Sequence, residues 1–212
     1  AYINKKSSLR LNIFSGKEKT YQAWNGIPQF LINDNRTYNS AGTQKSGTPY
    51  DNETDNYKQT HYQLFFNNAI NDSWSFNTAA FLTRGLGYYE NYRADEAFAN
   101  YGLPNIVVGN TTITKTDLVR QLWLDNHFYG QIFSFQRKKK NNILTIGGGW
   151  SKYDGKHYGK VIWANRGIEK DYTFYNLTAT KSDINLYAKI QHQLTNNLDF
   201  FVDVQYKNVQ HK

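Results

Sequence analysis

Apolar and polar residues alternate along much of the chain, most clearly near its end. In the stretch INLYAKIQHQLTNNLDFFVDVQY (184–206), Ile184, Leu186 and Ala188 alternate with polar residues, and the alternation resumes after Asn197. Strict alternation places successive side chains on opposite faces of a β-strand. Because this pattern recurs and helix patterns are nearly absent, we predict an all-β fold with seven strands. The predicted strands span residues 7–16, 57–70, 73–88, 118–138, 142–156, 180–194 and 198–209.

Short and long connections alternate between these strands. The short ones are built on Asn and Asp, which tolerate left-handed backbone. All short turns therefore lie at one end of the sheet and all long loops at the other, as in outer-membrane β-barrels with short periplasmic turns and long extracellular loops. We predict an antiparallel up-and-down meander within a single transmembrane β-barrel domain over residues 1–212. The turns are at 71–72, 140–142 and 195–197, and the loops are at about 17–56, 89–117 and 157–179.

The two faces of the predicted strands differ in charge. The apolar positions of the best-patterned strands contain no Lys, Arg, Asp or Glu. The alternate positions are polar and would line a wet interior, so we predict water inside the curve and lipid outside. Four phenylalanines on the wet side, and apolar residues on both faces of 118–138, indicate either packing against something in the pore or a soluble sheet buried on both faces. The polar positions are His61, Gln63, Asn67, Ser75, Asn77, Asn185, Lys189, Gln191, Asp199, Asp203 and Gln205, and the four phenylalanines are Phe14, Phe65, Phe81 and Phe201.

Composition excludes several classes of protein and site. Aromatic residues make up 17% of the chain, with 17 Tyr, and no apolar run is long enough for a membrane-spanning helix. The absence of cysteine excludes disulfides, thiol catalysis and zinc–thiolate sites. The formal net charge is +8, but the basic residues are scattered apart from one cluster at 137–140 beside a turn. We interpret that cluster as a solvated end and predict no nucleic-acid partner.

The number of strands is odd, whereas single-chain bacterial barrels have even numbers from 8 upward. The first and last strands would each expose an unpaired edge. The chain also lacks methionine, which indicates processing or excision from a longer chain. We therefore predict a fragment of a larger barrel, and pairing of the open edges between copies is one way in which an isolated fragment would satisfy them.

Several unusual strings occur in an order that resembles the TonB-dependent outer-membrane receptors of Bacteroidetes-type bacteria. The resemblance runs from about residue 5 to the end of the chain. The strings are SSLRLNIFSGKEKTYQAWNGIP (7–28), NRTYNSAG (35–42), YDNETDNYKQTHYQL (50–64), LTRGLGYYENYR (82–93), WLDNHFYG (123–130) and GGGWSKYDGKHYG (147–159).

This resemblance implies a C-terminal segment of a plugged 22-stranded barrel in the bacterial outer membrane. The implied activity is import of a scarce nutrient such as an iron chelate, cobalamin or a glycan. The implied partners are outer-membrane lipid, the rest of the barrel with its N-terminal plug, the inner-membrane TonB complex and the nutrient itself. The signal peptide, coupling box and plug of the family are absent from these residues, so this segment is not expected to transport alone.

No pattern typical of an enzyme is present: the chain contains no nucleophile elbow, phosphate-binding loop or H-E-x-x-H sequence. We predict no enzymatic activity and no cofactor. The string DNETD spaces Asp51, Glu53 and Asp55 two residues apart, which can direct carboxylate oxygens at one calcium ion. A solvated acidic loop is the alternative.

Aromatic residues in two long loops are the candidate ligand contacts. Tyr21 and Trp24 lie in the first loop, and exposed aromatic rings stack on sugars or apolar ligand surfaces. Packing of Trp24 onto neighbouring loop residues is the alternative. A soluble β-sandwich or small barrel that binds carbohydrate or a hydrophobic ligand through such aromatics is the alternative function. The second long loop offers Tyr88, Tyr89, Tyr92 and Arg93.

Overall fold

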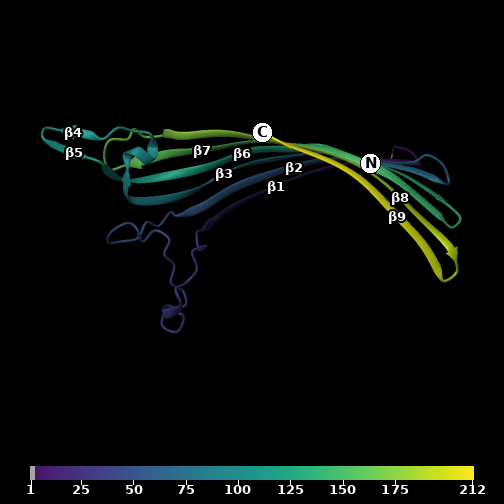
Figure 1. The fold of residues 1–212 in the computed structure, drawn as a ribbon, viewed down its shortest axis with the longest axis horizontal. Helices are drawn as coiled ribbons and strands as arrows, with labels where there is room; N and C mark the ends of the chain where they lie inside the picture. The colour runs from purple at the N-terminus through teal and green to yellow at the C-terminus, as the bar shows by residue number, and fades with distance from the viewer. Residues whose placement is uncertain (1–2) are drawn as a thin grey trace.

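The computed structural model describes residues 3–212, which form one antiparallel sheet of seven strands (Figure 1). The strands pair in chain order, except that a two-stranded ribbon is inserted between β3 and β6. The predicted all-β meander is confirmed. No helix within this range is long and apolar enough to cross a membrane. The elements are β1 (Ser7–Tyr21), η1 (Gln29–Leu31), β2 (Thr54–Ala69), β3 (Trp74–Ala97), η2 (Phe98–Tyr101), β4 (Ile106–Val108), β5 (Thr111–Ile113), β6 (Lys115–Lys139), β7 (Asn142–Ala164), β8 (Tyr172–Thr195) and β9 (Leu198–His211).

The three short turns lie at one end of the sheet, and their polar residues stabilise them as expected. The Asn71 carboxamide oxygen accepts hydrogen bonds of 3.0 Å from the backbone N–H groups of both Ser73 and Trp74. Lys140, between β6 and β7, has a positive φ of 48°. Between β8 and β9, the Asn197 N–H donates to the Thr195 hydroxyl oxygen at 3.3 Å. Side-chain acceptors of this kind replace backbone partners that a tight turn leaves free.

Most strands continue further into the loop end than the sequence pattern indicates. β3 extends to Ala97 and β7 to Ala164, and β8 begins at Tyr172 rather than near residue 180. The alternation fades there because apolar and polar side chains occur on both faces, as in the run KVIWA (160–164) of β7, although the backbone ladder continues. The three long connections are correspondingly shorter than predicted. They span residues 22–53, 98–114 and 165–171.

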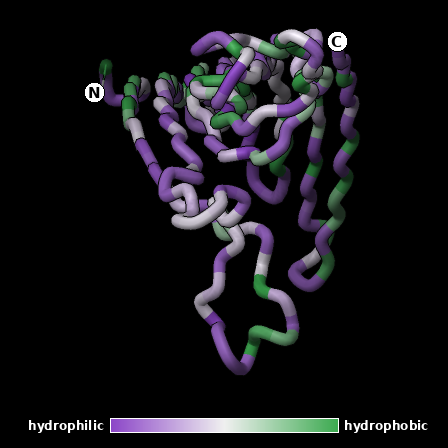
Figure 2. Tube along the Cα trace, turned by 90° about the vertical axis from the view of Figure 1, so that its left-hand side faces the viewer, coloured by the Kyte–Doolittle hydropathy of each residue, from purple (hydrophilic) through white to green (hydrophobic). Residues whose placement is uncertain are grey.

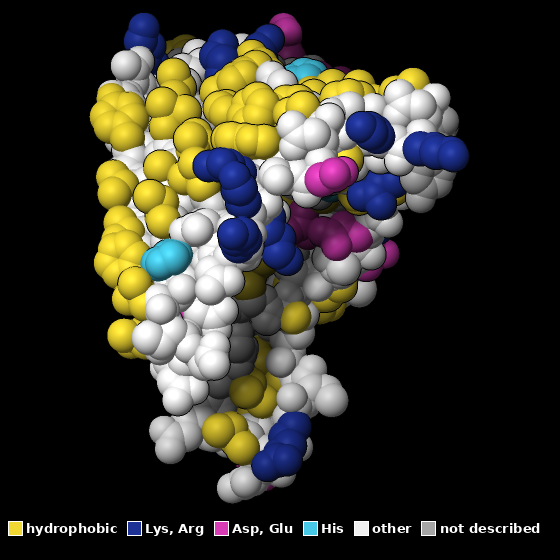
Figure 3. Space-filling model, turned by 90° about the vertical axis from the view of Figure 1, so that its right-hand side faces the viewer, with side chains coloured by type: hydrophobic (Ala, Val, Ile, Leu, Met, Phe, Trp, Pro, Cys, Tyr) yellow, Lys and Arg dark blue, Asp and Glu magenta, His cyan; other side chains and the backbone are white. Residues whose placement is uncertain are grey.

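The pairing register gathers the predicted apolar side chains on one face of the sheet. One row across the strands runs from Leu11 through Leu64, Ala80 and Trp150 to Ile184, passing Gln131 on β6. The sheet curves into an arch with β1 and β9 at opposite margins (Figure 2). Viewed from the turn end, apolar side chains cover the outer side of the arch (Figure 3), so this side is called the convex face.

The predicted polar positions share the opposite, concave face. Gln63 pairs with Phe81, and Asn77 pairs with Asn67. The four phenylalanines expected on the wet side lie there too, and Phe14 stacks on His61 with ring centroids 4.6 Å apart. The register also resolves β6, whose two apolar sets fall on different faces. Tyr129, Phe133 and Phe135 are convex, and Leu122, Leu124 and Phe128 are concave.

The convex face carries a band of uncharged residues. On β3 the band lies between Trp74 and Arg84, which are ten residues apart on the same face. At about 3.3 Å per residue and a barrel-like tilt of about 40°, this separation corresponds to a height of roughly 25 Å. The polar Gln131 inside the band donates a 3.0 Å hydrogen bond to the Thr78 hydroxyl oxygen, so its amide has a partner on the neighbouring strand.

The sheet is open, and β1 and β9 form its edges. Its buried core is small and lies at the loop end, where Tyr101, Leu118 and Val161 pack together. Within residues 3–212 no second sheet covers the convex face, so its large apolar side chains stay exposed: Leu11 is 63% and Val204 64% exposed. A soluble sandwich would bury such residues between two layers.

Candidate functional site

A polar pocket of about 260 Å³ lies at the loop end of the concave face. Its walls come from β3, β6 and the first long connection. The pocket combines two arginines, one glutamate, three aromatic residues and several amides, which suits a ligand with charge and hydrogen-bonding groups. Its lining residues are Gln22, Trp24, Asn25, Ser40, Gly42, Gln44, Glu53, Tyr89, Asn91, Tyr92, Arg93 and Arg120.

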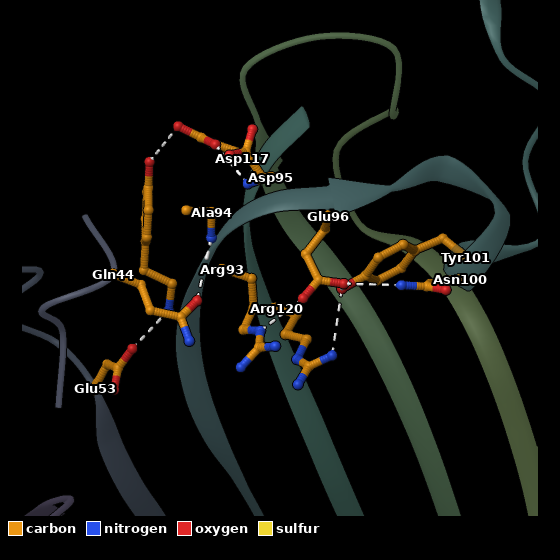
Figure 4. Close-up of polar contacts among 11 residues, drawn as sticks. Gln44, Glu53, Arg93, Ala94, Asp95, Glu96, Asn100, Tyr101, Asp117 and Arg120 are labelled. Atoms are coloured by element: carbon orange, nitrogen blue, oxygen red, sulfur yellow. Dashed lines mark hydrogen bonds and ion pairs between the residues drawn. The ribbon is translucent and has the colours of Figure 1, made fainter. Parts of the chain in front are cut away.

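A β-bulge in β3 shapes one wall of the pocket. The pairing with β6 shifts between Arg93 and Glu96, and Asp95 adopts a positive φ of 52°. The bulge is fixed by long-range partners, since the Asp95 N–H donates to an Asp117 carboxylate oxygen at 3.0 Å and the Ala94 N–H donates to Gln44 at 3.3 Å (Figure 4). The one extra residue on β3 returns Glu96 to the same side of the strand as Arg93.

The bulge creates a chain of polar contacts between the two arginines (Figure 4). Arg93 donates to Glu96 Oε1 at 2.8 Å, and the Tyr101 hydroxyl donates to Glu96 Oε2 at 3.3 Å. Arg120 donates in turn to the Tyr101 hydroxyl oxygen at 3.3 Å. One carboxylate thus holds one guanidinium directly and the other through a phenol.

Electrostatics favour an ionised Glu96. Burial alone would raise its pKa, but hydrogen bonds from Arg93 and Asn100, together with the nearby charge of Arg120, lower the pKa of Glu96 below its ordinary 4.5. Arg120 Nε is buried and has no hydrogen-bond partner among the described residues. Glu53, the carboxylate lining the pocket, accepts the Tyr92 N–H at 3.1 Å. Two guanidiniums therefore face the pocket together with the Glu53 carboxylate, and Glu96 is ion-paired with Arg93.

The first long connection is anchored over this pocket by Glu90 of β3. Its carboxylate accepts hydrogen bonds from the Tyr50 hydroxyl at 2.5 Å, from Asn52 at 2.6 Å and from Gln121 at 2.6 Å. Burial and the bond to Glu90 raise the pKa of Tyr50, so its hydroxyl remains a donor. Gln22 adds a bond of 3.0 Å to the Glu90 carbonyl oxygen. These contacts fix the segment that carries Trp24.

The predicted aromatic contacts separate into two groups. Trp24 meets the ring of Tyr89 edge to face at 5.6 Å, and both line the pocket together with Arg93. Tyr92 also contributes to the lining, but its hydroxyl donates to Asp117 at 2.7 Å. Their convergence on a pocket is compatible with the predicted ligand role, which stays a prediction.

The other two predicted contacts lie elsewhere. Tyr21 ends β1, and its hydroxyl donates to the Ala41 carbonyl oxygen at 3.2 Å, outside the pocket lining. Tyr88 occupies the convex face and packs on Trp123 with ring centroids 4.5 Å apart. Neighbouring residues of a strand point to opposite sides, so Tyr88 and Tyr89 cannot serve the same site.

The structure does not bring the three carboxylates of the acidic string together. Within residues 3–212 no group of three or more His, Asp or Glu side chains is placed to hold a metal ion. Glu53 is 7% exposed and accepts the Tyr92 N–H, whereas Asp55 is paired in β2 between Thr20 and Tyr89. Spacing along the chain brings carboxylates together only where the loop curls around the ion, and Glu53 already leads into a straight strand.

The sequence interpretation missed Arg120, Glu96 and Gln22. Arg120 lies in β6 opposite Asn91, and only the register places it beside the pocket. The one sequence signal for Arg120 is alternation within 118–138, which places it on the same face as Leu122 and Leu124. The sequence contains no such signal for Glu96, because the bulge that redirects its side chain depends on distant residues.

Comparisons with known proteins support the fold. No protein-family model matches the chain, and no curated protein sequence matches it. In fold it is similar to the crystal structure of the ferric-catecholate import receptor Fiu from K12 E. coli in its closed form, with a TM-score of 0.56 and 11% identity. The match covers 97% of this chain and 32% of the receptor chain. The chain thus spans about a third of that receptor's length, and the likeness is one of fold.

Proposed function

We propose that this chain forms part of the wall of a TonB-dependent outer-membrane transporter, which imports a scarce nutrient and performs no covalent chemistry. The convex band is the observation that carries the proposal. On β3 it is free of charge over a height of roughly 25 Å, which matches the lipid-facing band of outer-membrane barrels. Trp74 lies at its lower limit with Arg137 over its ring at 5.8 Å, as expected of an interfacial aromatic belt.

Two further observations support the proposal. The short turns lie at one end of the sheet and the long connections at the other, and the fold is similar to that of an import receptor. Seven strands would be about a third of a 22-stranded transporter barrel, which is plugged. The remaining strands and a plug are then partners, as is the inner-membrane TonB complex. The open edges of β1 and β9 would pair with the remaining strands, or between copies if the segment were isolated.

The alternative of a soluble sandwich has little support, since one layer of sheet leaves the apolar residues of the convex face exposed. Exposed apolar surface on this scale marks contact with lipid or another protein. The Bacteroidetes type of the proposed receptor rests on the sequence strings alone, and the similar solved receptor comes from E. coli.

We further propose that the loop-end pocket contacts the nutrient. Iron chelates, cobalamin and glycans are the candidate classes, and Arg120, which forms no ion pair among the described residues, favours a ligand with an anionic group. Trp24 and Tyr89 offer an aromatic corner beside them. Arg120 Nε, buried without a partner in the described chain, is a donor that a ligand acceptor would satisfy.

The test begins with the native polypeptide. An antibody to this segment, used on fractionated source cells, should detect a band well above the segment's own size in the outer membrane. That band should change mobility on heating. A soluble band of the segment's own size would overturn the proposal.

The pocket is tested in the same native polypeptide. Arg120→Gln should weaken binding of an anionic iron chelate by about tenfold, because charge-assisted bonds contribute about 1.5–3 kcal/mol. Tyr88→Ala, on the opposite face, is the control and should leave that affinity unchanged. Equal affinities for Arg120→Gln and the unmodified protein would remove the pocket from the transport path.

A further inference from the structure

Above the apolar band, the convex face becomes basic. Lys17 of β1 lies directly opposite Lys58 of β2, and both side chains are exposed. Like charges in this position destabilise a pair of strands. Neither lysine forms an ion pair within residues 3–212. The pair therefore favours a negative partner from outside the chain.

A groove of about 310 Å³ lies at the same level, farther across the sheet. Arg84, Lys156, Thr178 and Thr180 line it with cationic and hydroxyl donors. His127 completes this wall, and all five project from the convex face by their register. A row of donors from four adjacent strands suits an anion with several oxygens.

The groove also contains two carboxylates, but each has its own cation. Asp125 is paired with Arg84 at 2.7 Å, and Asp154 is paired with Lys152 at 3.0 Å. The Tyr129 hydroxyl donates to Asp154 at 2.9 Å. Lys156 is exposed and forms no ion pair among the described residues. The local excess charge is therefore positive.

Aromatic residues border the groove on the side away from the apolar band. Trp123 packs on Tyr88 with centroids 4.5 Å apart and stacks on Tyr158 with centroids 5.7 Å apart. Lys160 Nζ lies 5.8 Å from the centroid of the Tyr158 ring. Aromatic and basic side chains gather at this level in proteins whose apolar surface meets lipid headgroups.

We propose that this convex-face basic groove and the Lys17–Lys58 pair at the same level bind the phosphate groups of anionic membrane lipids. The acyl chains lie against the apolar band directly below. The assignment rests on the proposed outer-membrane location of the chain. A membrane lipid is the occupant, rather than free phosphate, because the donors lie at the margin of an apolar surface that only a molecule with long acyl chains would cover.

The test uses the native polypeptide containing this chain, extracted in mild detergent and freed of lipid. Native mass spectrometry measures its binding of phosphatidic acid and of a diacylglycerol with identical acyl chains. Loss of three cations in Lys17→Gln/Lys58→Gln/Lys156→Gln should lower phosphatidic acid affinity by about tenfold or more. The control is Lys45→Gln/Lys138→Gln/Lys140→Gln, which removes the same charge from a loop and from beside a turn. This control should leave the affinity for phosphatidic acid unchanged.

Heat-dependent mobility is recorded for every variant, so that only folded protein is compared. Equal affinity for the two lipids in the unmodified polypeptide, equal loss in the two triple variants, or no loss in the first would each overturn the inference. Binding of free inorganic phosphate in place of the lipid would overturn it as well. Outer-membrane location is read from the fractionation described above, so failure of the lipid site and failure of the transporter proposal give different results.

Discussion

Replacing Leu64 by arginine tests which solvent covers the convex face. Leu64 lies inside the band opposite Ala80, which is six residues from Trp74 toward the turns and four from Arg84 toward the loops. At about 3.3 Å per residue and a tilt of about 40°, the two limits are roughly 15 and 10 Å away along the membrane normal. An arginine at Leu64 therefore cannot place its whole side chain in water without crossing much of the apolar layer.

The two solvents predict different costs for this substitution. In lipid, a basic residue near the midplane of a barrel wall costs about 2–4 kcal/mol, which is roughly a 30- to 1,000-fold change in the unfolding equilibrium. In water, Leu64 is already 43% exposed. Replacing Leu64 would then lower the unfolding free energy by at most about 1 kcal/mol. A half-exposed leucine contributes only part of its full transfer free energy, and the aliphatic part of the arginine side chain restores some of that contribution.

Gln63→Arg is the matched control, because it adds the same charge one residue away on the concave face. Gln63 accepts one long hydrogen bond of 3.4 Å from Asn12, so its replacement should cost less than about 1 kcal/mol. The assay is equilibrium denaturant unfolding of the native polypeptide in lipid vesicles. Equal unfolding free energies for Leu64→Arg and Gln63→Arg, within about 0.5 kcal/mol, would refute the lipid-facing assignment.

Two further predictions concern packing and protonation. Gly130→Ala should destabilise the sheet by about 1–3 kcal/mol in the same unfolding assay, because the new Cβ would overlap the Trp150 carbonyl oxygen. Gly16→Ala is the control, since a Cβ at Gly16 meets open space and should not destabilise the sheet. Equal losses of unfolding free energy in the two variants would contradict the packing argument. Ionised Glu96 should stabilise the loop end above about pH 4.5, and this contribution should be lost as pH falls through its lowered pKa. Unfolding free energies between pH 7 and 3 should therefore fall more steeply for the unmodified protein than for Glu96→Gln, and parallel curves would contradict the sign.

The turn end of the molecule could be predicted residue by residue. Asn71, Lys140 and Asn197 act through neighbours within a few positions, so local sequence contains the information. The loop end could not, because its strands continue through residues with no two-sided pattern. The inserted β4–β5 ribbon was also missed, because its strands are only three residues long and are too short to show an alternating pattern.

The candidate site was predicted in part. Trp24, Tyr89 and Arg93 meet in the pocket, although Tyr21 and Tyr88 were grouped with them because they are close in the chain. The acidic string was interpreted by spacing alone, and the start of β2 keeps Asp51, Glu53 and Asp55 from converging.

The sequence by itself determined the two faces of the sheet, the number of main strands and the end at which the turns lie. Each of these follows from alternation or turn chemistry within a single segment. Only the tertiary structure decided which residues meet across strands. Arg93 and Arg120 become neighbours through the register of β3 and β6, and Glu96 joins them through a bulge held by Asp117 and Gln44. The groove of Arg84 and Lys156 likewise depends on strands far apart in sequence, because pairing energy is shared between segments and neither segment encodes it alone.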